Sequence, residues 1–137
     1  MSDKNFPDVI REIHDQDSRF GKGAYYFIRE ALDHTLKAME KKDKDKCGHV
    51  SGNELLEGIR EYALERFGPM TMTLMDHWNI RKCRDFGEIV FNLVEHGILG
   101  RTENDSLEDF EGGYDFKQAF ADPFLPQSYK SPPPDLN

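Results

Sequence analysis

The chain has 137 residues, of which 37% are hydrophobic and 12% aromatic. This is enough for one domain with a hydrophobic core, and it excludes a wholly disordered protein. The formal net charge is −8, and residues 103–137 carry −6 of it, with eight acidic residues against two lysines. Such an acidic balance disfavours nonspecific binding to polyphosphates or anionic lipids.

Membrane insertion and secretion are not indicated by the sequence. No apolar run approaches the roughly 20 residues that span a bilayer, and the first ten residues lack the apolar region of a signal peptide. Cys47 and Cys83 are too few for a disulfide framework. We therefore expect a cytoplasmic protein with reduced thiols and no membrane partner.

Two helices are expected within residues 5–42. The first is indicated by apolar residues at i, i+3, i+4 and i+7, namely Phe6, Val9, Ile10 and Ile13. Two glycines in the following loop interrupt it, since glycine disfavours a helix. A longer helix is predicted for residues 24–41, with an apolar side formed by Tyr25, Ile28, Leu32, Thr35, Leu36 and Met39.

The third helix is expected to begin after Ser51, because Glu54 three positions later completes a capping box. It ends at the Gly-Pro pair at 68–69, a permissive residue followed by a helix breaker. A fourth helix is predicted for residues 70–78, with Asn79 as its left-handed cap.

A fifth helix is predicted for residues 85–96 and is closed by Gly97. The sequences ILGRT and YDF that follow resemble short strands and predict a small β-hairpin. Three helices followed by a hairpin are typical of a winged helix. The predicted fold is therefore mainly α, with about five helices, a small β-hairpin and a winged-helix-like arrangement in residues 51–116.

The pattern indicates one domain over residues 1–121, with a helical N-terminal part at 5–42 and the winged-helix-like part at 51–116. Prolines are frequent after residue 121, and they prevent regular structure because each lacks a backbone donor. Residues 122–137 are therefore expected to form a Pro-rich extended tail.

Several sequence segments together resemble a family of small conserved bacterial proteins to which no activity is assigned. The hallmarks are HVSGxELLEGIR, DFGEIVFNLVE and DS-x-x-DF, which match HVSGNELLEGIR, DFGEIVFNLVE and DSLEDF here, together with AYYFIREAL upstream and GYDF downstream. The resemblance covers most of residues 6–120. It implies a bacterial, cytoplasmic, single-domain protein and supplies no catalytic residue.

The fifth predicted helix carries a second apolar strip, formed by Gly87, Phe91 and Val94, beside its core-facing side. Glycine inside a helix costs about 1 kcal/mol, so Gly87 indicates the close approach of a backbone or a ring. Glu88 and Glu95 would form a charged rim. The strip is either a groove for a protein partner or a second copy, or a second buried face within the chain. A non-catalytic interaction or self-association module is the expected function.

Nucleic-acid binding by a winged helix-turn-helix is an alternative. Arg81, Lys82, Arg84 and Asn92 would supply its contacts to phosphates and bases. The outward positions of the fifth helix nevertheless sum to −2, since they include three acidic residues, whereas a helix in the major groove lies between rows of phosphates. The sequence therefore disfavours this alternative.

Calcium binding is a second alternative, because residues 43–54 align with a twelve-residue EF-hand loop. The aligned ligand positions are Asp43, Asp45, Cys47, His49 (through its carbonyl), Ser51 and Glu54. The sulfur of Cys47 is a soft ligand at a position where calcium requires oxygen, and the chain has no second such loop. A charged surface linker before a capped helix explains the same residues.

Enzymatic motifs are weak. The DFG sequence at 85–87 lacks the Gly-rich loop and catalytic-loop motif of a kinase. The five histidines form no helix-borne metal pair. No catalytic residue and no cofactor are therefore predicted, calcium excepted as the alternative above.

Overall fold

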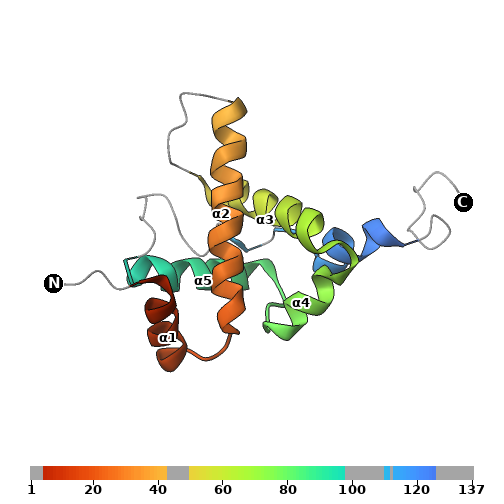
Figure 1. Cartoon of the computed structure of the whole chain (residues 1–137). Helices are drawn as coiled ribbons and strands as arrows, with labels where there is room; N and C mark the ends of the chain where they lie inside the picture. Colours follow the sequence, from red (N-terminus) through yellow and green to blue (C-terminus); the bar gives the residue numbers. More distant parts are fainter. Residues whose placement is uncertain (1–4, 43–49, 98–109, 112, 126–137) are drawn as a thin grey trace, which may run out of the picture.

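A computed structural model describes residues 5–42, 50–97, 110–111 and 113–125. Within them the chain forms five α-helices (Figure 1): α1 (Phe6–Gln16), α2 (Lys22–Lys42), α3 (Gly52–Phe67), α4 (Thr71–His77) and α5 (Cys83–Glu95). Shorter helical segments are the 3-10 turns Gly68–Met70 and Asp122–Phe124 and the π-helical turn Lys117–Ala121. The prediction of a mainly helical fold with about five helices is confirmed. None of the described helices is long and apolar enough to cross a membrane.

The predicted β-hairpin is not supported, because the described residues contain no β-strand. Its first strand, residues 98–102, lies outside the described residues. Its second, residues 114–116, leads into a helical turn instead, since Phe116 and Phe120 are spaced to lie on one helical side and their rings pack 5.1 Å apart. Within the described residues, the winged-helix-like arrangement therefore has no wing.

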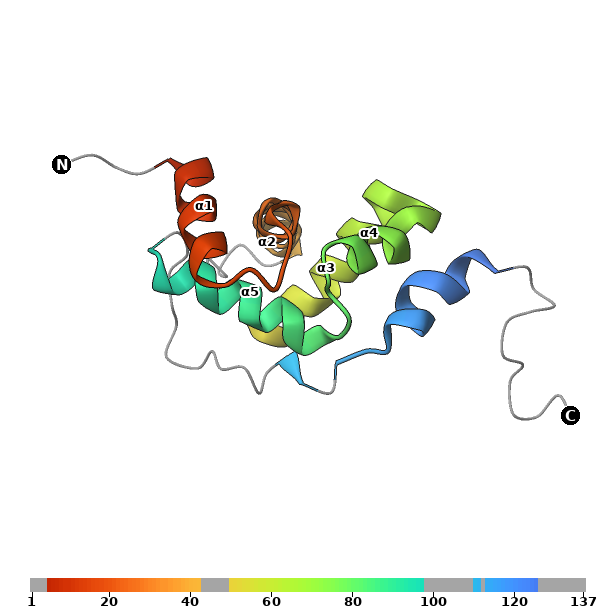
Figure 2. The same cartoon turned by 90° about the horizontal axis from the view of Figure 1, so that it is seen from below.

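Helix α2 lies at the centre of the fold, and its most extensive contacts are with α3. Figure 2 shows α2 end-on, with α1 on one side, α3 and α4 on the other, and α5 running beneath α1 and α2. The α2–α3 crossing is close because Gly58 has no side chain: a Cβ atom there would lie 1.7 Å from Thr35 Oγ1. The buried Thr35 hydroxyl donates to the Ala31 carbonyl at 2.8 Å, so this hydroxyl is hydrogen-bonded although it is buried.

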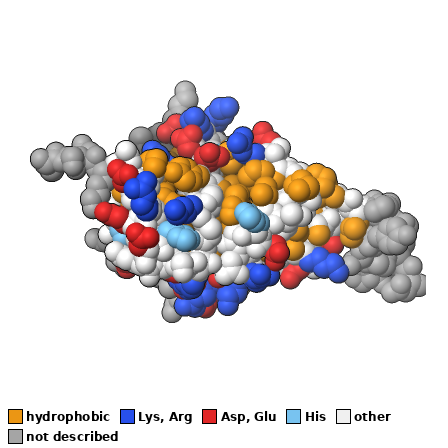
Figure 3. Space-filling model, turned by 60° about the horizontal axis from the view of Figure 1, so that its bottom comes forward, with side chains coloured by type: hydrophobic (Ala, Val, Ile, Leu, Met, Phe, Trp, Pro, Cys, Tyr) orange, Lys and Arg blue, Asp and Glu red, His pale blue; other side chains and the backbone are white. Residues whose placement is uncertain are grey.

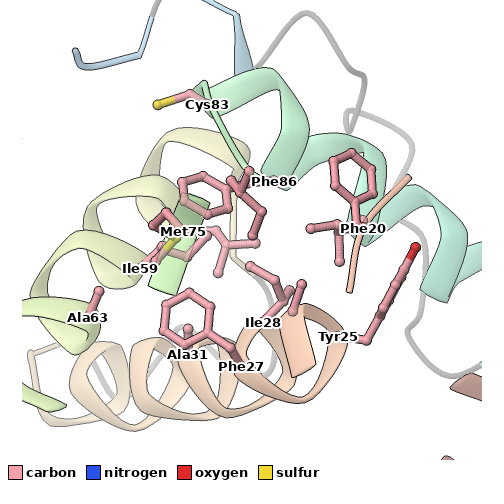
Figure 4. Close-up of a cluster of buried hydrophobic side chains, with 14 of the residues drawn as sticks. Phe20, Tyr25, Phe27, Ile28, Ala31, Ile59, Ala63, Met75, Cys83 and Phe86 are labelled. Atoms are coloured by element: carbon pink, nitrogen blue, oxygen red, sulfur yellow. The ribbon is translucent and has the colours of Figure 1, made fainter. Parts of the chain in front are cut away.

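The core contains apolar side chains from all five α-helices. Figure 4 shows part of it, where Phe27, Ile28, Ile59 and Phe86 converge from three helices. Helix α1 buries three of the four residues that its periodicity predicted, Val9, Ile10 and Ile13, whereas Phe6 is half-buried. Each fully buried large apolar side chain contributes about 1.5–3 kcal/mol.

The predicted helix ends at Ser51, Asn79 and Gly97 are confirmed, whereas α2 and α5 each begin two residues earlier than predicted. Ser51 Oγ accepts from the Glu54 backbone N–H at 3.2 Å, and Glu54 Oε1 accepts from the Ser51 backbone N–H at 3.0 Å. Asn79 and Gly97 both adopt left-handed backbone conformations, with φ of 64° and 76°. The short 3-10 helix at residues 122–124, with Pro123 in its first turn, shows that the predicted tail is not extended from its first residue.

Candidate binding surface

The apolar strip predicted on α5 is partly covered by the chain itself. Gly87 is buried, and a Cβ atom at this position would lie 2.7 Å from Cδ2 and 2.8 Å from Cγ of Phe110. The sequence predicted that a ring or a backbone lies close to Gly87, and this neighbour is the Phe110 ring of the same chain. At Gly87 the strip is therefore a second buried face within the chain. Phe91 and Val94 are half-buried and Glu95 is exposed.

A polar network joins the loop between α1 and α2 to the outer side of α5. Arg19 donates to both carboxylate oxygens of Asp17, at 2.9 and 2.8 Å, and to Glu88 at 3.0 Å. The amide of Asn92 donates to Asp17 at 3.2 Å and to the Tyr25 hydroxyl at 3.0 Å. Glu88 and Asn92, predicted as binding residues, therefore make contacts within the chain.

The electrostatics of this network follow from its contacts. The side-chain hydrogen bonds from Arg19 hold the pKa of the Asp17 carboxyl well below its usual range, and those to Asp17 and Glu88 raise the pKa of Arg19. Burial raises the pKa of the Tyr25 phenol. Both ends of the ion pair are thus stabilised in their charged forms.

The residues of the nucleic-acid alternative are largely used within the chain. Arg81 pairs with Asp76 at 2.7 Å, and Arg84 pairs with Glu111. Lys82, another residue of this alternative, is exposed. The ion pairs reduce the positive charge that these residues present to a phosphate backbone.

Asp85, one of the three acidic residues predicted on the outer side of the fifth helix, is instead buried. Its Oδ2 accepts from the backbone N–H groups of Arg81 and Lys82, at 2.8 and 3.2 Å. The carboxylate therefore fixes the turn that begins α5.

The calcium alternative lies mainly outside the described residues, since residues 43–49 contain its first four ligand positions. Of the other two, Ser51 and Glu54 form the capping box of α3. Among the described parts of the chain, no group of three or more His, Cys, Asp or Glu side chains is placed to hold a metal ion. The EF-hand alignment stays a prediction.

Cys83 borders an open cavity of about 370 Å³ at the start of α5. Its Sγ lies 3.4 Å from both the backbone N and the backbone O of Tyr114. Burial raises the pKa of the thiol, so the unreactive protonated form is favoured. We assign Cys83 a packing role.

An aromatic surface forms where α2, α3 and α4 meet. The Phe27 ring lies 5.9 Å from Tyr62, 5.5 Å from Phe67 and 5.5 Å from Trp78, measured between ring centroids. Phe27 is buried, whereas the other three rings are half-buried. Met70 follows in the 3-10 turn after α3 and is 55% exposed. Figure 3 shows hydrophobic side chains gathered in a band across one face of the molecule.

This surface continues into an open cleft of about 610 Å³ on α2 and α3. Its lining residues are Tyr26, Arg29, Glu30, Asp33, His34, Lys37 and Tyr62. Tyr62 donates its hydroxyl to Glu30 at 2.8 Å, and its ring lies 5.3 Å from that of His34. Tyr26 is 39% exposed and contacts the Phe6 ring edge-on at 5.0 Å. We call Tyr26, Tyr62, Phe67, Met70 and Trp78 the aromatic surface.

The sequence analysis did not single out this surface, although one signal was present. Tyr25, Tyr26 and Phe27 are consecutive, and successive side chains of a helix point about 100° apart. Three consecutive aromatic residues therefore cannot share one helical face. Tyr26 is the one that turns outward.

Comparison with known proteins gave no relative: no family model, no curated protein and no solved structure matches the chain.

Proposed function

We propose that the protein is a non-catalytic interaction module that binds another protein, or a second copy of itself, through the aromatic surface. The observation that carries this proposal is the exposure of Met70 and Tyr26, together with the half-buried rings of Tyr62, Phe67 and Trp78 that surround Phe27. Tyr, Trp, Phe, Met and Arg are the residue types enriched at protein interfaces.

The rigidity of these rings supports the proposal. Tyr62 is held by its hydrogen bond to Glu30, and Trp78 is stacked on Phe27. A Cβ atom at Gly23 would lie 2.6 Å from Trp78 Nε1, so the indole can pack at this position because Gly23 has no side chain. Side chains that are already ordered lose little conformational entropy when a partner binds.

Basic residues adjoin the aromatic surface. The Arg29 guanidinium lies 4.4 Å from the centre of the Phe6 ring, and that of Arg66 lies 6.0 Å from the centre of the Phe67 ring. Arginine beside aromatic rings combines apolar contact with hydrogen-bond donors. A partner that offers apolar side chains and backbone carbonyls would match the aromatic rings and the arginine donors.

Binding through Phe91, Val94 and Glu95 on α5 stays an alternative location for the same function. We favour the aromatic surface because the two other members of the α5 set, Gly87 and Glu88, are engaged by Phe110 and Arg19.

The test is Met70→Glu, which places a charge in the aromatic surface. Met70 is 55% exposed, so the fold is expected to remain intact. We expect the affinity for a second copy or a co-purified partner to fall at least tenfold, or roughly 1.4 kcal/mol. Sedimentation velocity over a concentration series and quantitative co-purification measure the change.

The matched control is Gln118→Glu, which adds the same charge at an exposed position of the segment after α5. The proposal is contradicted if the intact chain stays monomeric and binds no partner. If Met70→Glu binds normally and Phe91→Ala loses binding with its cooperative unfolding preserved, the site is on α5 instead.

A further inference from the structure

We propose that the cleft between Tyr26 and Tyr62 binds an extended proline-rich segment, and that its occupant is residues 126–137 of this same sequence. The inference rests on the proposed function and names the ligand class for part of the aromatic surface. It follows from the chemistry of the cleft, from the composition of that segment and from the length of chain beyond Leu125.

The cleft has two ordered aromatic rings, which an extended proline-rich segment requires. Such segments pack their rings against flat aromatic side chains and bind best in grooves that are already formed. Tyr26 and Tyr62 come from different helices and both line the cleft. Their rings are fixed by Phe6 on one side and by Glu30 and Phe27 on the other.

The polar lining also matches. A polyproline II segment has no internal hydrogen bonds, so its carbonyl oxygens need donors, while its prolines offer no N–H in return. Arg29 and Lys37 line the cleft and supply charged donors. Glu30 and Asp33 balance their charge.

The composition of residues 126–137 fits this lining. Four of these twelve residues are proline, at positions 126 and 132–134, and three of the four are consecutive. Lys130 and Asp135 give the segment no net charge, which suits a cleft with two basic and two acidic side chains. Residues 103–109 do not fit, because they contain four acidic residues and no proline.

The length of the segment is sufficient. The three consecutive prolines lie seven to nine residues beyond Leu125, which corresponds to about 22–28 Å in a polyproline II conformation. A folded domain of about 137 residues has a radius of gyration of about 14 Å. The prolines can therefore reach a cleft up to about two radii of gyration from Leu125, on their own molecule or on a second copy.

The experiment is amide NMR on the full chain and on a variant with Pro132→Ala, Pro133→Ala and Pro134→Ala. Resonances of Tyr26, His34 and Tyr62 are expected to differ between the two proteins. A synthetic peptide of residues 126–137, added to the variant, is expected to shift the same resonances saturably towards their positions in the intact chain. The same peptide with its three consecutive prolines replaced by alanine is the control and is expected to bind at least fivefold more weakly.

Two cleft variants identify the binding site. Tyr26→Ala should weaken peptide binding at least fivefold, whereas Tyr26→Phe, which keeps the ring, should retain most of it. Urea unfolding of both variants checks that the fold is intact. Dilution distinguishes occupation within one chain, which is independent of concentration, from occupation between copies, and either supports the inference.

Unchanged cleft resonances in the triple variant, together with no peptide-induced shift at millimolar peptide, would overturn the inference. Such a result leaves the proposed function standing on its own test, because Met70 does not line the cleft. If Met70→Glu loses partner binding while the cleft resonances do not respond to the peptide, the further inference fails and the proposed function is still supported.

Discussion

At Gly87 the ring of Phe110 occupies the space where any other residue would place its Cβ atom. Gly58 at Thr35 and Gly23 at Trp78 show the same relation. In each case the absence of a side chain lets a second element approach closely. These glycines weaken their own helices by about 1 kcal/mol each, and the contacts that they permit offset this cost.

Gly87→Ala is expected to destabilise the protein. Alanine favours the helix by about 1 kcal/mol, but the new methyl group lies under 3 Å from two ring atoms of Phe110, and overpacking of this kind costs about 1–3 kcal/mol. We expect the free energy of unfolding, measured in urea, to fall by about 1 kcal/mol. In a Phe110→Ala background the same change should be neutral or stabilising. An unconditional gain in stability would show that Phe110 does not cover Gly87.

The contacts of Asp17 are expected to make the free energy of unfolding decrease as the pH falls. Arg19 holds the pKa of Asp17 below its unfolded value, so the ion pair contributes stability above about pH 4 that is lost as the pH falls further towards the folded pKa. Asp17→Asn should lower the free energy of unfolding at pH 7 and flatten its decline between about pH 4 and pH 2. Urea unfolding over this range measures both effects.

Asp15→Asn is the matched control, an equal loss of charge at an exposed position two residues away. If Asp17→Asn and Asp15→Asn give the same pH profile, the network does not stabilise the folded state.

At the scale of the elements, helix ends are determined by residues close in sequence, whereas the burial of each helix face is determined by the neighbouring elements. The capping box of α3 uses groups three residues apart, so it forms wherever that sequence begins a helix. The consecutive aromatic residues of α2 have different neighbours: Tyr25 contacts Asn92 of α5, Phe27 contacts Trp78 beyond α4, and Tyr26 faces the cleft. The three consecutive rings thus have three different surroundings.

Ser51→Ala is expected to lower the free energy of unfolding by about 1 kcal/mol, because it removes the acceptor for the Glu54 backbone N–H at the start of α3. Ser51→Asp should retain most of the stability, since aspartate also caps helices. Urea unfolding compares the three proteins. Equal stability of Ser51→Ala and the intact chain would show that this cap contributes nothing.

At the scale of the whole molecule, the fold separates two surfaces. The outer side of α5 is joined to the α1–α2 loop by ion pairs and hydrogen bonds, which fixes α1 against the core. The aromatic surface lies where α2, α3 and α4 meet, and it presents rings that are already ordered. Mutations on the two sides are therefore expected to separate: those in the network lower stability, and those at Met70 and Tyr26 lower binding.

Local sequence determined the helices and their ends. The periodicity of α1, the Ser51–Glu54 cap and the left-handed Asn79 and Gly97 all depend on interactions within a few residues. The prediction of a strand at residues 114–116 was wrong, because Phe116 packs on Phe86 of α5 and on Phe120, which both lie outside the strand-like motif.

Tertiary structure alone decided which surfaces are covered. The contacts of Asp17 and Arg19 with α5, and of Phe110 with Gly87, join residues that are far apart along the chain. No periodicity or spacing encodes such pairs, since each depends on the angle at which complete helices pack. The sequence therefore predicted that Gly87 has a close neighbour. Only the packing of the helices determined that this neighbour is Phe110 and that the aromatic surface is exposed.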